Sequence, residues 1–291
     1  MKATVFEAGE ERRPSLLPAA RPRYLLCEPR YFAVVDELNP WMDRSVQPSP
    51  DCVVAEWTGL VRTVESLGAD VDVMRGVSGL PDLVFTRDAC IPLDGSYVRA
   101  RFRCPERRAE ADHVAAWLRR HGREPADLEP AQDAYLEGGD VCVFGPHVLA
   151  GWGFRSSRAG HAALADRLDV TVHSMRLVDP RFYHLDMCVC PLDGRHALVA
   201  PEMLDRAARR LLSDLVPEPI ELCRAEALSF CANAIVVDGC VVMSQCPPRL
   251  RHVLAEHGFE VRCAPVAEFR KAGGAVSCLT LPLNRSTRPA A

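Results

Sequence analysis

Four short stretches of the sequence carry side chains that could act together in catalysis. "FTRD" supplies Asp88, "LEGGD" supplies Glu137, "YHLD" supplies His184 and "AVSCLTL" supplies Cys278. A thiol and an imidazole are the minimal pair for covalent catalysis, because one attacks while the other moves protons. Residues two apart in a strand share a face, so Asp186 is expected beside His184. The alternatives are one more buried thiol for Cys278 and a satisfied core histidine for His184.

The carboxylates indicate what such a site would bind. Burying Asp88, Glu137 and Asp186 together costs free energy unless a cation neutralises them. They would also raise the pKa of the Cys278 thiol, away from the reactive thiolate. A guanidinium carries a permanent charge and a planar fork of N–H donors that matches carboxylates. We therefore expect Asp88 and Glu137 to bind a guanidinium, with the two glycines after Glu137 allowing close backbone approach to the ligand; a β-bulge is the alternative.

The chain repeats one pattern of elements four times. An apolar strand reaches a turn, a second strand follows, and then a helix and a short strand. Asp-Gly between alternating apolar runs is a strong signal for a hairpin. The turns are at Asp94-Gly95, Gly145-Pro146, Asp193-Gly194 and Asp238-Gly239. The expected helices span 106–121, 157–168, 202–215 and 248–258, and strands are expected at 170–177 and 259–266.

A fifth unit is expected from the two ends of the chain. Residues 24–75 supply a strand, a helix around 51–68 and another strand, and the missing hairpin partner would be a C-terminal strand around Cys278. Five similar units, one completed by the chain ends, predict a ring of ββαβ-type repeats in an α/β fold. The first strands would converge at its centre, where the candidate residues begin each unit. The alternative is a generic α/β domain with coincidental spacing.

Composition bounds the class of protein. The chain has 291 residues, a net charge of −4 and 48% hydrophobic residues, which fits a globular protein without a basic surface for nucleic acid. No apolar run approaches the roughly 20 residues of a membrane span, and no signal peptide is recognisable at the N-terminus. We expect a flexible tail over 1–22, one domain over 23–283 and a C-terminal tail over 284–291. Thirteen cysteines, most of them in apolar runs, favour free thiols and a cytoplasmic protein.

Neither a metal nor a cofactor is expected. Zinc bound by His184, Cys188 and Cys190 is disfavoured because the two cysteines alternate in a strand pattern and no second ligand pair has zinc-site spacing. No phosphate-cradling glycine loop follows a strand, which argues against a nucleotide cofactor.

The motifs "FTRDA", "LEGGDV", "FYHLD" and "GGAVSCLTL", in this order, resemble those of the guanidino-group-modifying superfamily. It includes arginine deiminases, dimethylarginine dimethylaminohydrolases and amidinotransferases, and the resemblance covers residues 23–283. "LNPWMD" at Leu38 to Asp43 is similar to compact bacterial dimethylargininase-type members. The resemblance implies the five-bladed α/β propeller, or pentein, fold.

The resemblance also implies catalytic roles. Cys278 would attack the guanidinium carbon and form a covalent thiouronium-type adduct. His184 would protonate the leaving amine and then activate water. Asp88 and Glu137 would hold the guanidinium nitrogens, and Asp186 would contact the substrate or His184.

Further substrate contacts follow from the same resemblance. Arg107 and Arg155 match arginines that bind the α-carboxylate, and Asp82 matches a position that faces the α-amino group. Arg87 and Asn233 are expected to contact the substrate as well. For Arg107, Arg155 and Asp82 the alternatives are a solvated helix start, a loop charge and a turn residue.

The resemblance favours one reaction among several. "FTRD" is the form found in arginine deiminases, but those carry a helical insertion that 291 residues cannot accommodate. Compact members that hydrolyse arginine twice typically have Asn where Asp88 stands. We therefore expect single hydrolysis of arginine, or of an Nω-substituted arginine, to citrulline plus ammonia or an amine. An amidinotransferase, a dihydrolase giving ornithine and a non-catalytic binding protein stay as alternatives. The expected partner is a small guanidino substrate, and a homodimer is compatible with the resemblance.

Overall fold

The computed structural model describes residues 21–93, 95–128 and 133–284. Its strands are β1 (Arg23–Cys27), β2 (Asp70–Met74), β3 (Cys90–Leu93), β4 (Ser96–Arg99), β5 (Val141–Phe144), β6 (His147–Trp152), β7 (Val172–Arg176), β8 (Val189–Pro191), β9 (His196–Val199), β10 (Glu218–Glu221), β11 (Ile235–Val237), β12 (Cys240–Met243), β13 (Glu260–Cys263) and β14 (Leu281–Pro282). Its α-helices are α1 (Pro50–Ser66), α2 (Arg108–Arg120), α3 (Arg158–Leu168), α4 (Arg206–Leu215), α5 (Arg224–Leu228), α6 (Pro248–Glu256) and α7 (Ala267–Arg270).

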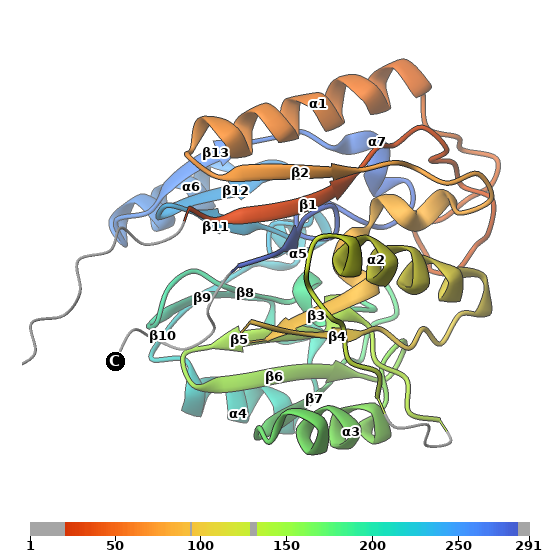
Figure 1. Ribbon diagram of the computed structural model, residues 1–291. Helices are drawn as coiled ribbons and strands as arrows, with labels where there is room; N and C mark the ends of the chain where they lie inside the picture. The colour runs from red at the N-terminus through yellow and green to blue at the C-terminus, as the bar shows by residue number, and fades with distance from the viewer. Residues whose placement is uncertain (1–20, 94, 129–132, 285–291) are drawn as a thin grey trace, which may run out of the picture.

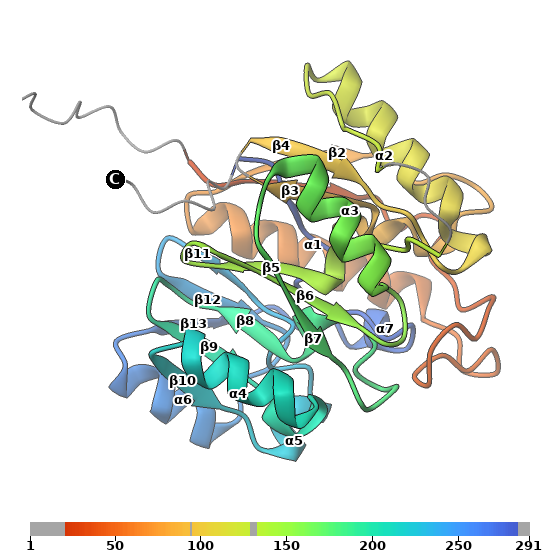
Figure 2. The same ribbon diagram turned by 90° about the horizontal axis from the view of Figure 1, so that it is seen from below.

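The strands form five small sheets, and the longer helices lie on the outer side of them (Figures 1 and 2). The sheets are β14–β1–β2, β3–β4, β5–β6–β7, β8–β9–β10 and β11–β12–β13. In the three-stranded sheets an antiparallel pair is extended by a third strand parallel to the middle one. In the β3–β4 unit a single parallel bridge between Val98 and Ala126 takes the place of the third strand. The predicted α/β class is confirmed.

The two ends of the described chain meet in one sheet, as the repeat predicted. Strand β14 pairs antiparallel with β1, with Leu281 opposite Leu25. Cys278 itself lies in a turn just before β14 and not in a strand, so the predicted strand position was wrong by a few residues. The apolar run around Cys278 reflects burial and not sheet pairing.

The helices form where residues with helical apolar periodicity follow a residue that favours the start of a helix. Helix α1 buries Val53, Leu60 and Val64 on one side, with spacings that suit a helix. The side chain of Ser157 accepts a hydrogen bond from the Gly160 N–H and so caps α3. Helices α1, α3 and α6 lie within two residues of their predicted bounds.

Two helices begin later than predicted, and two were missed. Helix α2 starts at Arg108 because Pro105–Arg107 form a separate 3-10 turn. Helix α4 starts at Arg206 because the Asp205 side chain accepts from the Ala208 N–H and fixes the helix start there. Helices α5 and α7 are short, with too little periodicity to predict.

The Asp-Gly turns follow the expected backbone chemistry where they are described. Asp238 and Gly239 have φ of 47° and 77° between β11 and β12. Positive φ at both central positions is the type I′ turn that joins twisted antiparallel strands. Asp94 lies outside the described residues, so the first predicted turn is described only at Gly95.

The predicted tails lie almost entirely outside the described part of the chain, and the single domain over 23–283 stays a prediction. All thirteen cysteines are free thiols. Within the described residues, no helix is both long and apolar enough to cross a membrane.

We predict that Gly138→Ala destabilises the protein because its added methyl has no room. A Cβ at Gly138 would lie 2.0 Å from the backbone oxygen of Arg87 and 2.6 Å from that of Cys90. Such overpacking against backbone lowers the free energy of unfolding by roughly 1–3 kcal/mol. Urea unfolding measures this change.

The matched control is Gly59→Ala on the exposed face of α1, where a Cβ meets nothing within 4 Å. There the substitution is expected to raise the free energy of unfolding by about 0.5–1 kcal/mol, because alanine favours a helix. Equal effects of the two substitutions would contradict the close approach at Gly138.

Candidate functional site

The predicted catalytic side chains stand before the first strands of different sheets. Asp88 lies in the 3-10 turn η2 (Thr86–Ala89) before β3, and Glu137 precedes the turn η4 (Gly138–Asp140) before β5. His184 precedes the turn η5 (Leu185–Met187) before β8, and Cys278 precedes β14. Asn233 stands before β11 in the same way. Because η2 contacts η4 and η4 contacts η5, these strand entries converge as predicted.

His184 is fully buried between two carboxylates. Its Nε2 donates to Glu137 Oε2 at 2.9 Å, and its Nδ1 lies 3.5 Å from Asp88 Oδ1. Burial opposes the imidazolium charge, but Asp88 and Glu137 outweigh it and raise the pKa of His184 to about 9. Burial likewise opposes charge on Glu137, but Arg155 and His184 lower the pKa of that carboxyl to about 2. At neutral pH the pair is therefore an imidazolium and a carboxylate.

The two glycines after Glu137 make room for parts of the protein itself. A Cβ on Gly139 would lie 2.6 Å from His184 Nδ1 and 2.7 Å from Asp88 Oδ1. Gly139 thus lets the imidazole and the Asp88 carboxylate pack against the backbone of η4. The alternative of a β-bulge is excluded, because these glycines open a 3-10 turn.

Cys278 is buried, and its thiol is held in the uncharged form. Asn233 Nδ2 donates to the Cys278 Sγ at 3.1 Å, and the Sγ lies 3.8 Å from Asp186 Oδ2. Burial first, and then the negative charges of Asp186 and Asp88, raise the thiol pKa well above its usual range. A positive charge brought next to Cys278 would act in the opposite direction.

His184 and Asp186 do not share a strand face, so that part of the prediction was wrong. His184 has extended backbone, whereas Asp186 lies inside the 3-10 turn η5. A 3-10 turn rotates about a third of a circle per residue, so side chains two apart point in different directions. Asp186 therefore accepts a hydrogen bond from the Ser277 hydroxyl at 3.0 Å, while His184 faces Glu137. Burial raises the pKa of Asp186 to about 6.

The two predicted carboxylate-binding arginines pair with the two predicted guanidinium-binding carboxylates. Arg107 Nη1 donates to Asp88 Oδ2 at 2.9 Å, and its Nη2 donates to Glu110 Oε2 at 2.8 Å. Arg155 Nη1 donates to Glu137 Oε2 at 3.3 Å. Each guanidinium thus occupies one of the carboxylates that were expected to bind substrate.

Buried negative groups outnumber buried positive groups around Cys278. Among the described residues of this region, three buried side chains are cationic: Arg107, Arg155 and His184. Six buried carboxyl groups face them or one another, namely Asp82, Asp88, Glu110, Glu137, Asp140 and Asp186. Burial raises the pKa of Glu110 to about 8 and that of Asp140 to about 7, which relieves part of the imbalance by protonation.

Four buried polar atoms of this region have no hydrogen-bond partner within the described part of the chain: Asp82 Oδ1, Asp88 Oδ1, Asp186 Oδ1 and His184 Nδ1. Three of these atoms are carboxylate oxygens, and an unsatisfied buried acceptor costs roughly 1–3 kcal/mol, so native proteins satisfy such groups with water or a ligand. The region can therefore accept a ligand rich in N–H donors.

Sequence reasoning missed two buried carboxyl groups that position the others. Asp140 accepts from the backbone N–H groups of Leu185 and Ser156 at 3.1 and 3.0 Å, which fixes the segments that carry His184 and Arg155. Glu110 holds Arg107 from three residues along the chain, a spacing at which helical side chains meet. In the sequence, the spacing of three residues from Arg107 could have indicated Glu110, and Asp140 stands at the end of the motif "LEGGD".

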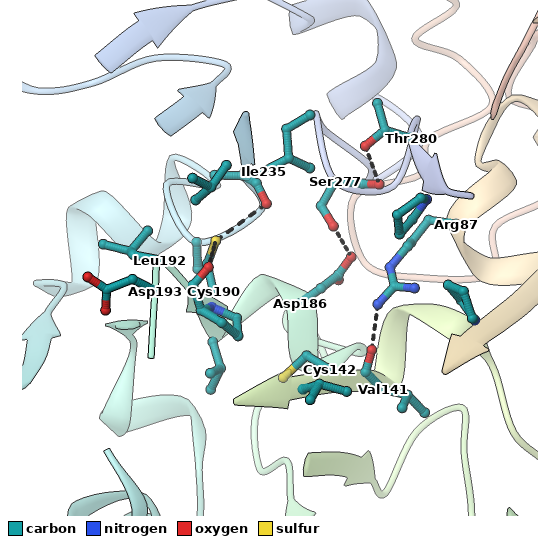
Figure 3. A pocket seen from close by; sticks show the side chains of 18 of the residues that line it. Arg87, Val141, Cys142, Asp186, Cys190, Leu192, Asp193, Ile235, Ser277 and Thr280 are labelled. Carbon is teal, nitrogen blue, oxygen red and sulfur yellow. Dashed lines mark hydrogen bonds between the residues drawn. The ribbon is translucent and has the colours of Figure 1, made fainter. Parts of the chain in front are cut away.

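A cavity of about 400 Å³, shown in Figure 3, adjoins the cluster of buried candidate residues around Cys278. It meets the cluster at Asp186 and Ser277, and strand residues such as Val141 and Ile235 form its walls. Arg87 extends into this cavity, where its Nη2 donates to the Val141 carbonyl at 2.5 Å. The structure therefore does not bring Arg87 together with Asp88 and Glu137, although Arg87 precedes Asp88 in sequence.

Comparison with known proteins agrees with this site. The model of the family described as N,N dimethylarginine dimethylhydrolase, eukaryotic, matches residues 21–285. The chain belongs to this family of guanidino-group-modifying proteins, which confirms the resemblance seen in its motifs.

Several curated relatives are more than 30% identical. The bifunctional arginine dihydrolase/ornithine cyclodeaminase ArgZ of Synechocystis sp. is 37% identical over 273 residues, which cover 92% of this chain and 38% of ArgZ. The N(G),N(G)-dimethylarginine dimethylaminohydrolase of Mycobacterium tuberculosis is 36% identical over 262 residues, covering 90% of this chain and 86% of that one. The chain thus spans well under half of the bifunctional relative and most of the mycobacterial one.

Solved structures share the fold. The product-bound N-terminal domain of ArgZ, an arginine dihydrolase, has a TM-score of 0.87 and 36% identity, covering 92% of this chain and 100% of that one. A dimethylarginine dimethylaminohydrolase adduct with 4-chloro-2-hydroxymethylpyridine has a TM-score of 0.74 at 21% identity, covering 90% of this chain and 99% of that one, and so supports the fold alone. The chain therefore shares the α/β fold of these solved structures.

We predict that Asp186→Asn makes Cys278 more reactive. Removing the negative charge 3.8 Å from the sulfur lowers the thiol pKa, and each pKa unit is worth roughly tenfold in thiolate. Alkylation of the Cys278 peptide by iodoacetamide at pH 8, followed by mass spectrometry, should be several-fold faster than in wild type.

Asp193→Asn is the matched control, because Asp193 lines the same cavity but is 43% exposed. It should leave the alkylation rate of Cys278 unchanged. A slower reaction in Asp186→Asn than in wild type would contradict the electrostatic role given to Asp186.

Proposed function

We propose that this protein is a cysteine-dependent hydrolase of the guanidinium group of L-arginine or of an Nω-substituted arginine. The products would be L-citrulline and ammonia or an amine. The observation that carries this proposal is the excess of buried carboxyl groups over cations around a buried thiol. A cationic substrate supplies the missing charge, and relatives at 36–37% identity are named for acting on arginine or dimethylarginine.

Binding would exchange the partners of Asp88 and Glu137. The substrate guanidinium would replace the protein's own guanidiniums on these carboxylates and satisfy the unpaired Asp88 Oδ1. Arg107 and Arg155 would then be available for the substrate α-carboxylate. Glu110 would keep hold of Arg107 throughout, because it binds a different face of that guanidinium through Nε and Nη2.

The substrate would also activate its own nucleophile. The thiol is neutral in the free protein because burial and Asp186 oppose its ionisation, which raises its pKa. A guanidinium carbon close to Sγ brings positive charge that lowers the thiol pKa. The thiol would therefore release its proton to solvent, and become a thiolate, only as the substrate binds. The hydrogen bond from Asn233 would then stabilise the negative sulfur.

The reaction would run in two balanced steps. The Cys278 sulfur forms a bond to the guanidinium carbon, the C–N bond to one terminal nitrogen breaks, and the imidazolium of His184 gives that nitrogen its proton. Neutral His184 then takes a proton from water as the water oxygen bonds to the same carbon. The C–S bond then breaks and its electron pair returns to sulfur, while the hydroxyl proton passes to solvent, so the ureido group of citrulline and the thiolate are formed.

The remaining assignments orient the substrate. Asp82 would accept from the α-amino group through its unpaired Oδ1. Asp186 would accept a guanidinium N–H through its unpaired Oδ1, next to the sulfur. Arg87 extends into the cavity and away from the Asp88 carboxylate. It would therefore affect the substrate indirectly, through its positive charge near Asp186.

We also infer that the five sheets are the blades of one propeller with Cys278 at its centre, and that residues 23–283 are a single catalytic domain. Two facts support this: each strand entry that carries a candidate residue begins a different sheet, and the two ends of the described chain complete one sheet. Oligomeric state, including a homodimer, is not needed for this site, because all of its proposed groups come from one chain.

Double hydrolysis of arginine to ornithine is the second candidate function. Its support is the name of the Synechocystis relative, an arginine dihydrolase 37% identical to this chain. Asp88 argues against this function, because compact members of the superfamily that hydrolyse arginine twice typically have Asn at this position. A carboxylate at this position makes charge-assisted hydrogen bonds to a guanidinium, which the neutral ureido group of citrulline cannot match.

We predict that purified protein converts arginine or a methylated arginine to citrulline without any acceptor amine. Cys278→Ser should lose the activity by roughly a thousandfold or more, because a hydroxyl at this site cannot form the adduct at a useful rate. Mass spectrometry of the products, with each substrate and with and without glycine as an acceptor, measures the outcome.

The matched thiol control is Cys52→Ser, because Cys52 is an exposed cysteine of α1 that the proposed reaction does not use. That variant should keep full activity. If ornithine forms without an acceptor amine, the reaction is double hydrolysis and not single hydrolysis. If ornithine forms only when an acceptor amine is present, the reaction is amidino transfer.

We predict that kcat/KM falls as pH rises through about 9. His184 has its pKa raised to about 9, so it is a proton donor below that pH and loses the proton above it. Asp140 contributes to this raised pKa through its negative charge. In Asp140→Asn the alkaline limb of the pH profile should therefore move to lower pH.

Asp166→Asn on the exposed face of α3 is the control and should leave the limb in place. A limb that stays fixed in Asp140→Asn, or one that moves to higher pH, would contradict the assignment of the limb to His184.

A further inference from the structure

A second group of potential ligand side chains lies at the far end of the β8–β9 hairpin from His184. His196 is the first residue of β9 and Glu218 is the first residue of β10, and the two are direct neighbours in the parallel pairing. His257 follows helix α6 and reaches the same place. One ligand atom from each of the three lies within 4.8 Å of the others.

The distances suit a small divalent ion. His196 Nε2 lies 2.9 Å from Glu218 Oε2, and His257 Nδ1 lies 3.9 Å from the same oxygen. Zinc bonds of about 2.0–2.1 Å in tetrahedral geometry place neighbouring ligand atoms about 3.3 Å apart. The two distances lie on either side of this value and the two histidine nitrogens lie within 4.8 Å of each other, so side-chain rotations would be needed to complete the geometry.

The neighbouring side chains orient two of the ligands. Asp193 Oδ2 lies 2.9 Å from His196 Nδ1 and can accept a hydrogen bond from it. With an ion bound, the Nδ1–H would then be kept by Asp193, and the Nε2 lone pair on the Glu218 side would be free to bind the ion. A carboxylate on the outer nitrogen of a histidine is the usual support of a metal ligand. Arg195 Nε donates to Glu218 Oε1 at 3.0 Å, which leaves Oε2 to face the histidines.

We infer that His196, Glu218 and His257 bind a divalent ion of the zinc type, with water completing its coordination. Two imidazole nitrogens and one carboxylate oxygen are borderline ligands that zinc accepts. The ion would join the end of α6 to the β8–β9–β10 sheet and so connect two neighbouring repeat units. Its role is structural, because these residues lie at the opposite end of the hairpin from the catalytic cluster.

Sequence spacing could not indicate this site, and we expected no metal. His196 and Glu218 are 22 residues apart, and the three ligands come from three different elements. The competing explanation is a protonated His196 held between Asp193 and Glu218 with no ion.

The test is zinc binding to the full chain after dialysis against EDTA. Isothermal titration should show one zinc per chain, and zinc at a hundredfold excess over its Kd should raise the melting temperature by roughly 5 °C. In His257→Ala, where the side chain is 35% exposed, folding should persist and the shift should be lost. His252→Ala on the same helix, 76% exposed, should keep the full shift.

Cobalt(II) in place of zinc tests whether cysteines are the ligands, because a thiolate ligand would add an intense sulfur charge-transfer absorption. Its absence, together with loss of binding in both His257→Ala and His196→Ala, supports the site. No zinc binding by wild type, or equal binding by wild type and His257→Ala, would overturn it.

Discussion

The structure depends on how negative charge is buried around one thiol. Six carboxyl groups share a region with three cationic side chains among the described residues, and the imbalance leaves unpaired acceptors and carboxyl groups with raised pKa values. Such an arrangement is costly in a protein interior unless a cation enters. The same negative charge keeps Cys278 protonated in the free protein. Entry of a cationic substrate would therefore both pair the carboxylates and allow Cys278 to become a thiolate.

The repeat explains how this charge is assembled. The segment before the first strand of each sheet contributes one or two polar side chains to the same place, so no single segment has to carry the whole site. Gly138 and Gly139 allow the turns to touch, since any side chain there would meet Arg87 or His184. The backbone contacts thereby fix the His184–Glu137 pair at 2.9 Å.

The arginines show how a resting site can stay folded while its substrate is absent. Arg107 and Arg155 neutralise Asp88 and Glu137, and Glu110 gives Arg107 a second partner that does not have to be released. In the proposed function these internal pairs are exchanged for substrate pairs. The net gain in binding is therefore a difference between similar interactions, which favours a substrate that carries both a guanidinium and a carboxylate.

The sequence by itself determined the repeat, the longer helices to within a few residues and most of the residues that meet at the site, although Glu110 and Asp140 were missed. It could do so because hydrophobic periodicity and Asp-Gly turns are local signals, and because ordered motifs place one polar residue at each strand entry. Only the tertiary structure decided which side chains pair. The 3-10 turn η5 separates His184 from Asp186, Arg87 extends into the neighbouring cavity, and His257 reaches Glu218 from another unit. Those outcomes depend on contacts between residues far apart in the chain, and no local pattern encodes them.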